Sequence, residues 1–348
     1  NFHGKTLSGI EELSPRWKRA VNTIDNILGE AVGKLYVKKH FKPEAKKRME
    51  ILVNNLKDAY RERIEQLDWM SEETRDKALV KLSKFRAKIG YPDKWKDYSG
   101  LVIKKDELLH NIKRAVIHNY DREISKLGKP IDRDEWFMTP QTVNAYYNPS
   151  MNEVVFPAAI LQPPFFNLEA DDAVNYGAIG AVIGHEMTHG FDDQGRKSDG
   201  DGNLKEWWTD KDAENFKRRS QKLVEQFNRY VAIDTFHING QFTLGENIAD
   251  LGGLTIAYHA YQMSLQGKQA PIIDGWTGDQ RFFFGWAQIW RRKYRDDELR
   301  KRILTDPHSP SSFRVMGPVV NMPEFYAAFN VTDLDTLYIP PDKRVQIW

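Results

Sequence analysis

The sequence predicts a mainly α-helical fold of the α+β class, with a small β-sheet. Several long segments carry apolar residues at the helical period, whereas only two short segments have the composition of strands. The chain has 348 residues, which is long for a single hydrophobic core. Because the turn-forming stretch 89–100 ends the first helical block, we expect one part in residues 1–100 and a second in residues 101–348.

The expected helices cover most of the chain. The first has Ser14 as its N-cap and Pro15 at its first position, and its apolar residues recur at the helical period. The other helices are expected at 45–67, 72–85, 105–127, 175–191, 210–231, 246–265 and 279–294. The strands are expected within 142–148 and 152–160, with turn-forming residues between them. A helical layer should therefore precede the part that holds the sheet.

Composition excludes several function classes. The net charge of +2 gives no general argument for nucleic-acid binding, and the basic run 38–50 is interleaved with glutamates, as is typical of a solvated helix face. The longest apolar run, 176–184, is too short to span a bilayer. Because the chain has no cysteine, a disulfide framework, a thiolate nucleophile and a Cys-ligated metal are excluded.

The segment 182–190, VIGHEMTHG, places two histidines four residues apart, with a glutamate directly after the first. On a helix, His185 and His189 lie on one face, where both can direct a ring nitrogen at one zinc ion. Glu186 would lie beside the metal without binding it, in position to act as a general base. The alternative is a pair of surface histidines that binds no metal.

A catalytic zinc site needs a third protein ligand. The three-histidine pattern of the metzincins is excluded, because it requires histidine where this chain has Gly195. The segment 245–253, GENIADLGG, offers Glu246 as the ligand. Asp250, one turn later, could accept a hydrogen bond from the non-ligating nitrogen of a zinc histidine. Alternatively, both acids complement the dipole of a helix N-terminus.

The segment 306–315, DPHSPSSFRV, offers two further candidates. His308 lies in an expected loop, where an imidazole N–H could stabilise the anionic intermediate of peptide hydrolysis. Arg314 could bind a substrate carbonyl or carboxylate. Their alternatives are a loop-capping histidine and a surface arginine.

Several motifs occur in a characteristic order: GKTLSGIEELSPRWKRAVN, VNAYYNP, VVFPAAILQPPFF, VIGHEMTHGFDDQGR, GENIADLGG, HSPSSFRV and the terminal Trp348. Together they resemble the neprilysin and endothelin-converting-enzyme family of zinc metallopeptidases, over essentially the whole chain. The resemblance implies a thermolysin-like zinc peptidase domain in residues 101–348. Residues 1–100 would be the C-terminal part of an all-helical lobe that covers the active-site cavity.

The resemblance implies a chemical role for each matching position. Glu186 matches the general base, Asp250 the carboxylate behind a ligating histidine, and His308 the donor to the transition state. One Zn²⁺ per chain is implied, and its matching ligands are His185, His189 and Glu246.

The resemblance also implies how a peptide substrate is held. Arg314 matches a substrate-binding arginine. The edge-strand positions that hold an extended peptide by strand addition match Asn144 and Ala145. The positions that form a pocket for the large apolar side chain just after the scissile bond match Ile160, Phe165, Val182 and Trp290.

The function implied is that of a zinc-dependent endopeptidase. It would hydrolyse oligopeptides on the N-terminal side of large hydrophobic residues, by Glu186-assisted attack of water at the zinc. Rival interpretations are a peptide-binding protein without turnover, a structural zinc site and an aminopeptidase. A structural site would usually close with four ligands, often thiolates, and the chain has none.

Two departures from the family pattern affect partners and location. Family members are longer, so the missing N-terminal half is expected as a companion, in the form of a second chain or fragment. Vertebrate members end in Cys-x-x-Trp, where this cysteine-free chain has Val345 at the cysteine position, so it resembles a bacterial member. We expect an extracytoplasmic location, with a cytoplasmic one as the alternative, and neither nucleic-acid partners nor a membrane span.

Overall fold

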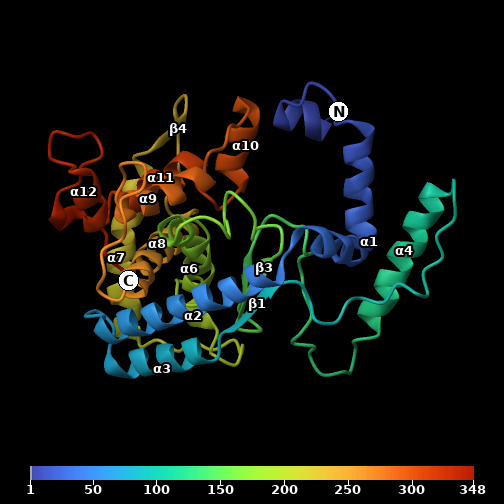
Figure 1. Cartoon of the computed structure of the whole chain (residues 1–348), viewed down its shortest axis with the longest axis horizontal. Helices are drawn as coiled ribbons and strands as arrows, with labels where there is room; N and C mark the ends of the chain where they lie inside the picture. The colour runs from blue at the N-terminus through green and yellow to red at the C-terminus, as the bar shows by residue number, and fades with distance from the viewer. Residues whose placement is uncertain (1) are drawn as a thin grey trace.

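The structure, a computed structural model, describes residues 2–348 and is mainly helical with two small sheets (Figure 1). The α-helices are α1 (Arg16–His40), α2 (Pro43–Gln66), α3 (Glu72–Ser83), α4 (Leu108–Ile124), α5 (Asp172–Asn175), α6 (Ala181–Thr188), α7 (Asp210–Asn228), α8 (Leu244–Ser264), α9 (Gly278–Ile289), α10 (Asp296–Thr305), α11 (Ser311–Val319) and α12 (Pro323–Phe329). The strands are β1 (Arg86–Gly90), β2 (Tyr146–Asn148), β3 (Glu153–Pro157), β4 (Val231–Ile233) and β5 (Phe236–His237). The predicted α+β class is confirmed.

Most expected elements are present, with shifted ends. Helix α1 begins at Arg16 with Pro15 as its N-cap and no side-chain capping bond, so the predicted Ser14 cap is wrong by one residue. The helix expected at 175–191 is divided, because a π-helical turn, Tyr176–Gly180, joins α5 to α6. Strands β2 and β3 lie where they were predicted, whereas the strands β1, β4 and β5 and the helices α10, α11 and α12 were not predicted.

The larger sheet has the strand order β1-β3-β2. Strand β3 pairs in parallel with β1 and antiparallel with β2. Every residue of β3 is buried, which explains why its sequence is a continuous apolar run after Glu153 rather than an alternating one. Strand β2 has β3 on one side only, so its other edge is available for pairing.

Helices α6 and α8 form the centre of the molecule, with α2 crossing beside them (Figure 1). Two glycines allow the close approach of α6 and α8. A Cβ on Gly184 would lie 2.5 Å from the carbonyl oxygen of Gly253, and a Cβ on Gly253 would lie 2.3 Å from the backbone nitrogen of His185. No larger side chain fits here, so this contact fixes the separation of the two helices.

The two expected parts of the chain share one hydrophobic core. Strand β1 pairs with β3, and α2 packs on α8, so contacts cross the boundary expected near residue 100. That division remains a prediction. Within residues 2–348, no helix combines the length and the apolar composition needed to cross a bilayer.

Helices α1 and α4, with the segment 91–107 that leads from β1 to α4, form what we call the helical arm, at the right of Figure 1. Its apolar side chains are largely exposed. Trp17 and Leu35 of α1 and Val116 and Ile117 of α4 are examples. The apolar period therefore predicted the helix α1 correctly, but its apolar face is uncovered.

Candidate metal centre

The structure brings the three predicted zinc ligands together. The Nε2 atoms of His185 and His189 are 3.1 Å apart, and the Oε2 atom of Glu246 lies 3.2 Å from the first and 3.7 Å from the second. A tetrahedral zinc site with bonds of about 2.1 Å places its ligand atoms roughly 3.4 Å apart. These three atoms thus form one face of a suitable tetrahedron.

The donor set also fits zinc chemically. Glu246 Oε2 is buried and makes no hydrogen bond of acceptable geometry within residues 2–348, although imidazole nitrogens surround it. Burial raises the pKa of Glu246, but the neighbouring His185, His189 and His308 outweigh burial and leave this pKa lowered. Zinc, a borderline-soft cation, binds both imidazole nitrogens and carboxylate oxygens, and three such ligands leave a fourth position open.

Local structure explains how distant residues meet here. His185 lies on α6, His189 is the C-cap of that helix, and Glu246 lies in the first turn of α8. The glycine contact between α6 and α8 brings the first turn of α8 against the histidine face of α6. The dipole interpretation of Glu246 is compatible with this position, but it does not explain why the carboxylate lies against two imidazoles.

A buried ion pair orients His185. The Nδ1 atom of His185 lies 2.8 Å from Asp250 Oδ1, so a proton on Nδ1 leaves the lone pair of Nε2 free for a metal. The Nε and Nη2 atoms of Arg314 donate to the same carboxylate, at 2.7 Å and 2.6 Å. Burial is the largest influence and raises the pKa of Asp250, but the charges and hydrogen bonds of Arg314 and His185 together outweigh it and leave this pKa lowered. Asp250 is therefore an ionised, buried hydrogen-bond acceptor rather than a helix-end acid.

Arg314 is buried, not a surface arginine. Its guanidinium also lies over the ring of Trp290, 4.0 Å from the ring centroid. Trp290, which was predicted to line an apolar substrate pocket, therefore also packs against the guanidinium of Arg314.

His189 has an orienting carboxylate that sequence reasoning missed. Its Nδ1 atom lies 2.9 Å from Asp192 Oδ2. The other oxygen of Asp192 accepts hydrogen bonds from the backbone N–H groups of Gln194, at 2.9 Å, and Gly195, at 2.7 Å. The available signal was an aspartate three residues after His189, just beyond the end of α6.

His308 lies beside the three ligand atoms, in the turn between α10 and α11. Its Nε2 atom is 3.1 Å from Glu246 Oε2, and its side chain is partly exposed. The Nδ1 atom lies 2.7 Å from Asp306 Oδ1, a second orienting carboxylate that was missed. Arg302 pairs with the other oxygen of Asp306, at 2.7 Å. The aspartate two residues before His308 was the sequence signal.

Glu186 lies on α6 between the two histidines, and it is buried with 7% of its surface exposed. The pKa of Arg314 is raised. Burial is the largest influence and lowers this pKa, but the ion pair with Asp250 opposes burial most strongly, and the negative charge of Glu186 adds to that opposing effect. The general base predicted from the sequence is thus a buried acid on α6, and its role remains a prediction.

A cavity of about 630 Å³ opens beside the ligands, and His189 and Glu246 form part of its wall. Its other lining residues include Tyr147 of β2, Asp193 and Phe242. The lining includes none of the four residues predicted for the apolar pocket. Of these, Ile160 and Val182 are buried, whereas Phe165 and Trp290 are partly buried. Their substrate role remains a prediction.

The substrate-holding positions Asn144 and Ala145 directly precede the edge strand β2. Asn144 is exposed and Ala145 is buried. The free edge of β2 is a suitable place for strand addition, because backbone groups there have no strand on one side.

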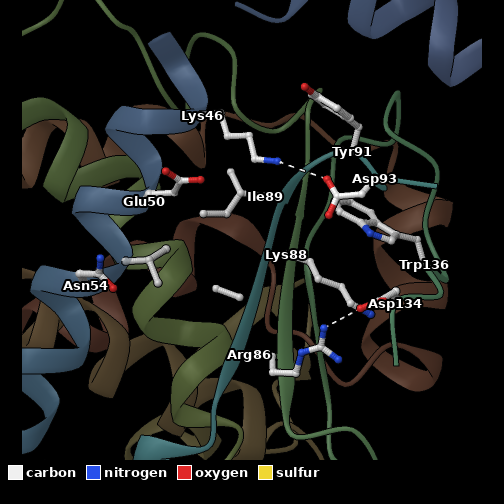
Figure 2. Close-up of a pocket in the computed structure, with 12 residues that line it drawn as sticks. Lys46, Glu50, Asn54, Arg86, Lys88, Ile89, Tyr91, Asp93, Asp134 and Trp136 are labelled. Atoms are coloured by element: carbon white, nitrogen blue, oxygen red, sulfur yellow. Dashed lines mark hydrogen bonds and ion pairs between the residues drawn. The ribbon is translucent and has the colours of Figure 1, made fainter. Parts of the chain in front are cut away.

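A second cavity, of about 440 Å³, lies between α2 and β1 (Figure 2). Its charged lining residues are largely paired with one another. Arg86 pairs with Asp134 at 2.6 Å, and Lys46 lies 4.0 Å from Asp93. None of the predicted site residues lines it, and its charges are largely neutralised.

The fold and the donor set define the class of zinc metallopeptidases in which a His-Glu-x-x-His helix is joined by a downstream glutamate. Models of peptidase family M13 match residues 1–92 and 144–345, and the chain belongs to this family. The predicted resemblance is thereby confirmed.

Individual relatives agree with this assignment. The chain is 39% identical to neprilysin of Oryctolagus cuniculus over 100% of this chain and 48% of that protein. It is 40% identical to an endothelin-converting enzyme homolog of Locusta migratoria over 93% of this chain and 46% of that protein. The crystal structure of the Mycobacterium tuberculosis zinc metalloprotease Zmp1 with an inhibitor is 59% identical, with a TM-score of 0.96, over 100% of this chain and 53% of that one. The chain thus spans about half the length of these relatives.

Proposed function

We propose that this chain carries the catalytic centre of a zinc-dependent endopeptidase that hydrolyses oligopeptides. The observation that supports this most directly is the triangle formed by His185 Nε2, His189 Nε2 and Glu246 Oε2, with separations of 3.1 to 3.7 Å. When bound there, Zn²⁺ would lower the pKa of a water molecule and polarise the scissile carbonyl. The structural-zinc alternative is weaker, because three ligands leave one position open.

Glu186 and His308 supply the proton transfer and the charge stabilisation. The carboxylate of Glu186 accepts the proton of the attacking water and later passes it to the nitrogen of the leaving amine. His308 donates an N–H to the developing oxyanion, and Asp306, 2.7 Å from its Nδ1, holds the imidazole in place. The 3.1 Å between His308 Nε2 and Glu246 Oε2 supports the role of His308, and the position of Glu186 directly after His185 on α6 supports the role of Glu186.

Arg314 and the edge strand orient the substrate. The Nε and Nη2 groups of Arg314 donate to Asp250, and Nη1 makes no hydrogen bond within residues 2–348, so its N–H groups are the donors proposed for a substrate carbonyl. Asn144 and Ala145 directly precede β2, the edge strand of the sheet, and their backbone groups pair with an extended peptide that lies along this edge. When a peptide is held in this way, one of its peptide bonds lies beside Glu186 in a fixed orientation.

The test of the proposed base is Glu186→Gln. Because a general base contributes about 10²- to 10⁴-fold, this change should reduce peptide cleavage by that factor and leave the zinc content unchanged. Glu214→Gln on the exposed face of α7 is the matched control and should cleave as the unaltered chain does. Cleavage at the full rate by Glu186→Gln would exclude this base. Absence of cleavage by the unaltered chain, with zinc bound, would favour a peptide-binding protein.

Substrate preference is tested separately. We propose that Ile160, Phe165, Val182 and Trp290 accept a large hydrophobic side chain after the scissile bond. Peptides with Phe or Leu at that position should be cleaved at least about tenfold faster than the same peptides with Ala. Acetylation of the peptide N-terminus should not slow cleavage, whereas an aminopeptidase would lose its substrate. Equal cleavage of the Phe and Ala peptides would refute the pocket assignment.

The companion half and the location also remain proposals. The exposed apolar faces of α1 and α4 support a further polypeptide segment that covers the helical arm. Adding the upstream half of the protein should increase peptide cleavage and protect these faces from an apolar dye. An extracytoplasmic location is tested by fractionation of cells that produce the whole protein.

A further inference from the structure

Lys81 is a buried lysine that the mechanism above does not use. It lies near the C-terminal end of α3, and only 1% of its surface is exposed. Its Nζ atom donates hydrogen bonds to the carbonyl oxygens of Gly195, at 2.7 Å, and Ser198, at 2.6 Å. Burying an ammonium group is costly unless its donors are satisfied, so this position needs a physical explanation.

Three aromatic rings lie around the amine of Lys81. The rings of Tyr147, Phe191 and Trp207 lie with their centroids 5.5 to 5.9 Å from Nζ. Burial is the dominant influence and lowers the pKa of Lys81 to about 7, against the opposing charges of Asp192 and Asp199. The amine donates to backbone carbonyls rather than to a carboxylate, so its hydrogen bonds restrain the backbone around Gly195 and Ser198.

That segment connects directly to a predicted zinc ligand. Gly195 accepts from Lys81 through its carbonyl oxygen and donates its N–H to Asp192 Oδ1, at 2.7 Å. Asp192 Oδ2 lies 2.9 Å from His189 Nδ1. A continuous series of contacts therefore leads from Lys81 through Gly195 and Asp192 to His189.

Other contacts also hold this segment: the backbone N–H groups of Lys205 and Trp207 donate to the carbonyls of Lys197, at 2.8 Å, and Arg196, at 3.2 Å. Lys81 differs from these contacts because one buried amine joins the carbonyls of both Gly195 and Ser198. Trp207 Nε1 also donates to the Gly195 carbonyl, but its distance of 3.2 Å is longer than that of Lys81. Gly195 is packed so closely that a Cβ would lie 2.2 Å from the carbonyl oxygen of His189. A small shift of the 192–198 segment would therefore move the carboxylate that orients His189.

We propose that Lys81 is a positioning residue that holds the 192–198 segment so that Asp192 keeps His189 in its metal-binding orientation. The proposal rests on the proposed zinc function and concerns a residue outside the motifs that predicted it. In this role Lys81 acts only through its hydrogen bonds to the backbone carbonyls of Gly195 and Ser198, and it contacts neither substrate nor metal.

The experiment compares Lys81→Met with Lys84→Met in the full chain. Methionine keeps the volume of the buried stem and removes the donors, whereas Lys84 is exposed and pairs with Asp201 at 2.8 Å. Zinc affinity is measured by competition with a chelator, and the geometry of the site by the visible absorption of bound Co²⁺. The unfolding free energy of the metal-free protein is measured in parallel.

Lys81→Met should bind zinc about 10- to 100-fold more weakly and shift the Co²⁺ spectrum, as expected when a group behind a metal ligand is lost. Lys84→Met should match the unaltered chain in both measurements. Unchanged zinc affinity and Co²⁺ spectrum in Lys81→Met, even with lower stability, would leave Lys81 a purely structural residue and overturn the proposal.

Two further outcomes separate this inference from the proposed function. Failure of the unaltered chain to bind zinc would refute both, whereas normal zinc binding by the chain and by Lys81→Met would refute the positioning role alone. If Lys81→Met does not fold, Lys81→Gln takes its place, because its amide can still donate to one carbonyl. That variant should weaken zinc binding several-fold, and an unchanged affinity would again overturn the proposal.

Discussion

Helices α8 and α1 were both predicted from the sequence, but they differ in how far their side chains are buried. Most of α8 is buried between α6, α2 and α11, whereas the buried residues of α1 are Gly29, Glu30 and Gly33. Leu254 of α8 has 0% of its surface exposed, and Leu35 of α1 has 70%. The helical period therefore identifies a helix without identifying what covers it.

The difference explains why the site lies where it does. A metal centre needs ligand atoms held to within a fraction of an ångström, and closely packed helices provide that restraint. Helices α6 and α8 meet at Gly184 and Gly253 and have little freedom to shift. The helical arm lacks such packing on its apolar faces, so it is suited to contact another surface rather than to hold a metal. The following predictions test this contrast, in order of decreasing expected effect.

The largest effect is expected when the buried ion pair behind His185 is broken. Asp250→Ala leaves the guanidinium of Arg314 buried without its carboxylate, which should lower the free energy of unfolding by about 3 to 5 kcal/mol. In the arm, Glu107→Ala removes a partly exposed partner of Arg114 and should cost at most about 1 kcal/mol. Urea denaturation measures both. Equal losses would show that the arm is packed as firmly as the centre.

The same leucine truncation sharpens the contrast without involving charge. Leu254→Ala removes fully buried atoms from α8 and should cost about 2 to 5 kcal/mol. Leu35→Ala in α1 should change the free energy of unfolding by no more than about 0.5 kcal/mol, because its side chain is already in contact with solvent. Thermal and urea denaturation of the two variants provide the comparison. A loss above 2 kcal/mol for Leu35→Ala would contradict the exposed arm.

The sequence predicted the relative placement of side chains where placement follows from spacing within one helix. His185 lies on α6 and His189 is its C-cap four residues later, while Glu246 and Asp250 lie on one face of α8, so their relative positions could be read directly from the chain. The predicted strands β2 and β3 were also recognisable, because turn-forming residues separate two β-like segments.

The features that were missed depend on loops and on packing between distant segments. Asp192 and Asp306 reach their histidines through turns whose shape the sequence does not specify. Strand β1 follows a helix closely and is stabilised by pairing with β3, about sixty residues later in the chain, which no local pattern indicates. The burial of Lys81 likewise depends on three aromatic rings from separate parts of the sequence.

A pH-dependent prediction compares two aspartates. Asp212 accepts hydrogen bonds from Ser71, Thr74 and Thr209. Burial is the largest single influence and raises the pKa of Asp212, but these hydrogen bonds together outweigh it, so the pKa is lowered. Its contribution to stability is therefore present above the ordinary pKa of 3.8 and is lost as the pH falls through the lower value of the folded state.

Asp212→Asn should accordingly lower the free energy of unfolding by about 1.5 to 3 kcal/mol at pH 7, and the difference should shrink below pH 4. Asp97→Asn in the arm is the matched change, because its carboxylate accepts hydrogen bonds only from the neighbouring Ser99 within residues 2–348. Its effect should be smaller at every pH. Urea denaturation between pH 3 and 7 measures both, and parallel curves for Asp212→Asn and the unaltered chain would refute the assignment.

The smallest effect on stability is expected on the exposed face of α4, and it is the most direct test of what the arm is for. Replacing Val116 and Ile117 with serine should change the free energy of unfolding by no more than about 0.5 kcal/mol each, since both side chains are more than half exposed. The same changes remove apolar surface, so they should reduce dye binding and self-association measured by light scattering. If the proposed companion half covers the arm, these changes should also weaken its binding. If stability falls while association is unaffected, the face packs within this chain, and the contrast between centre and arm is lost.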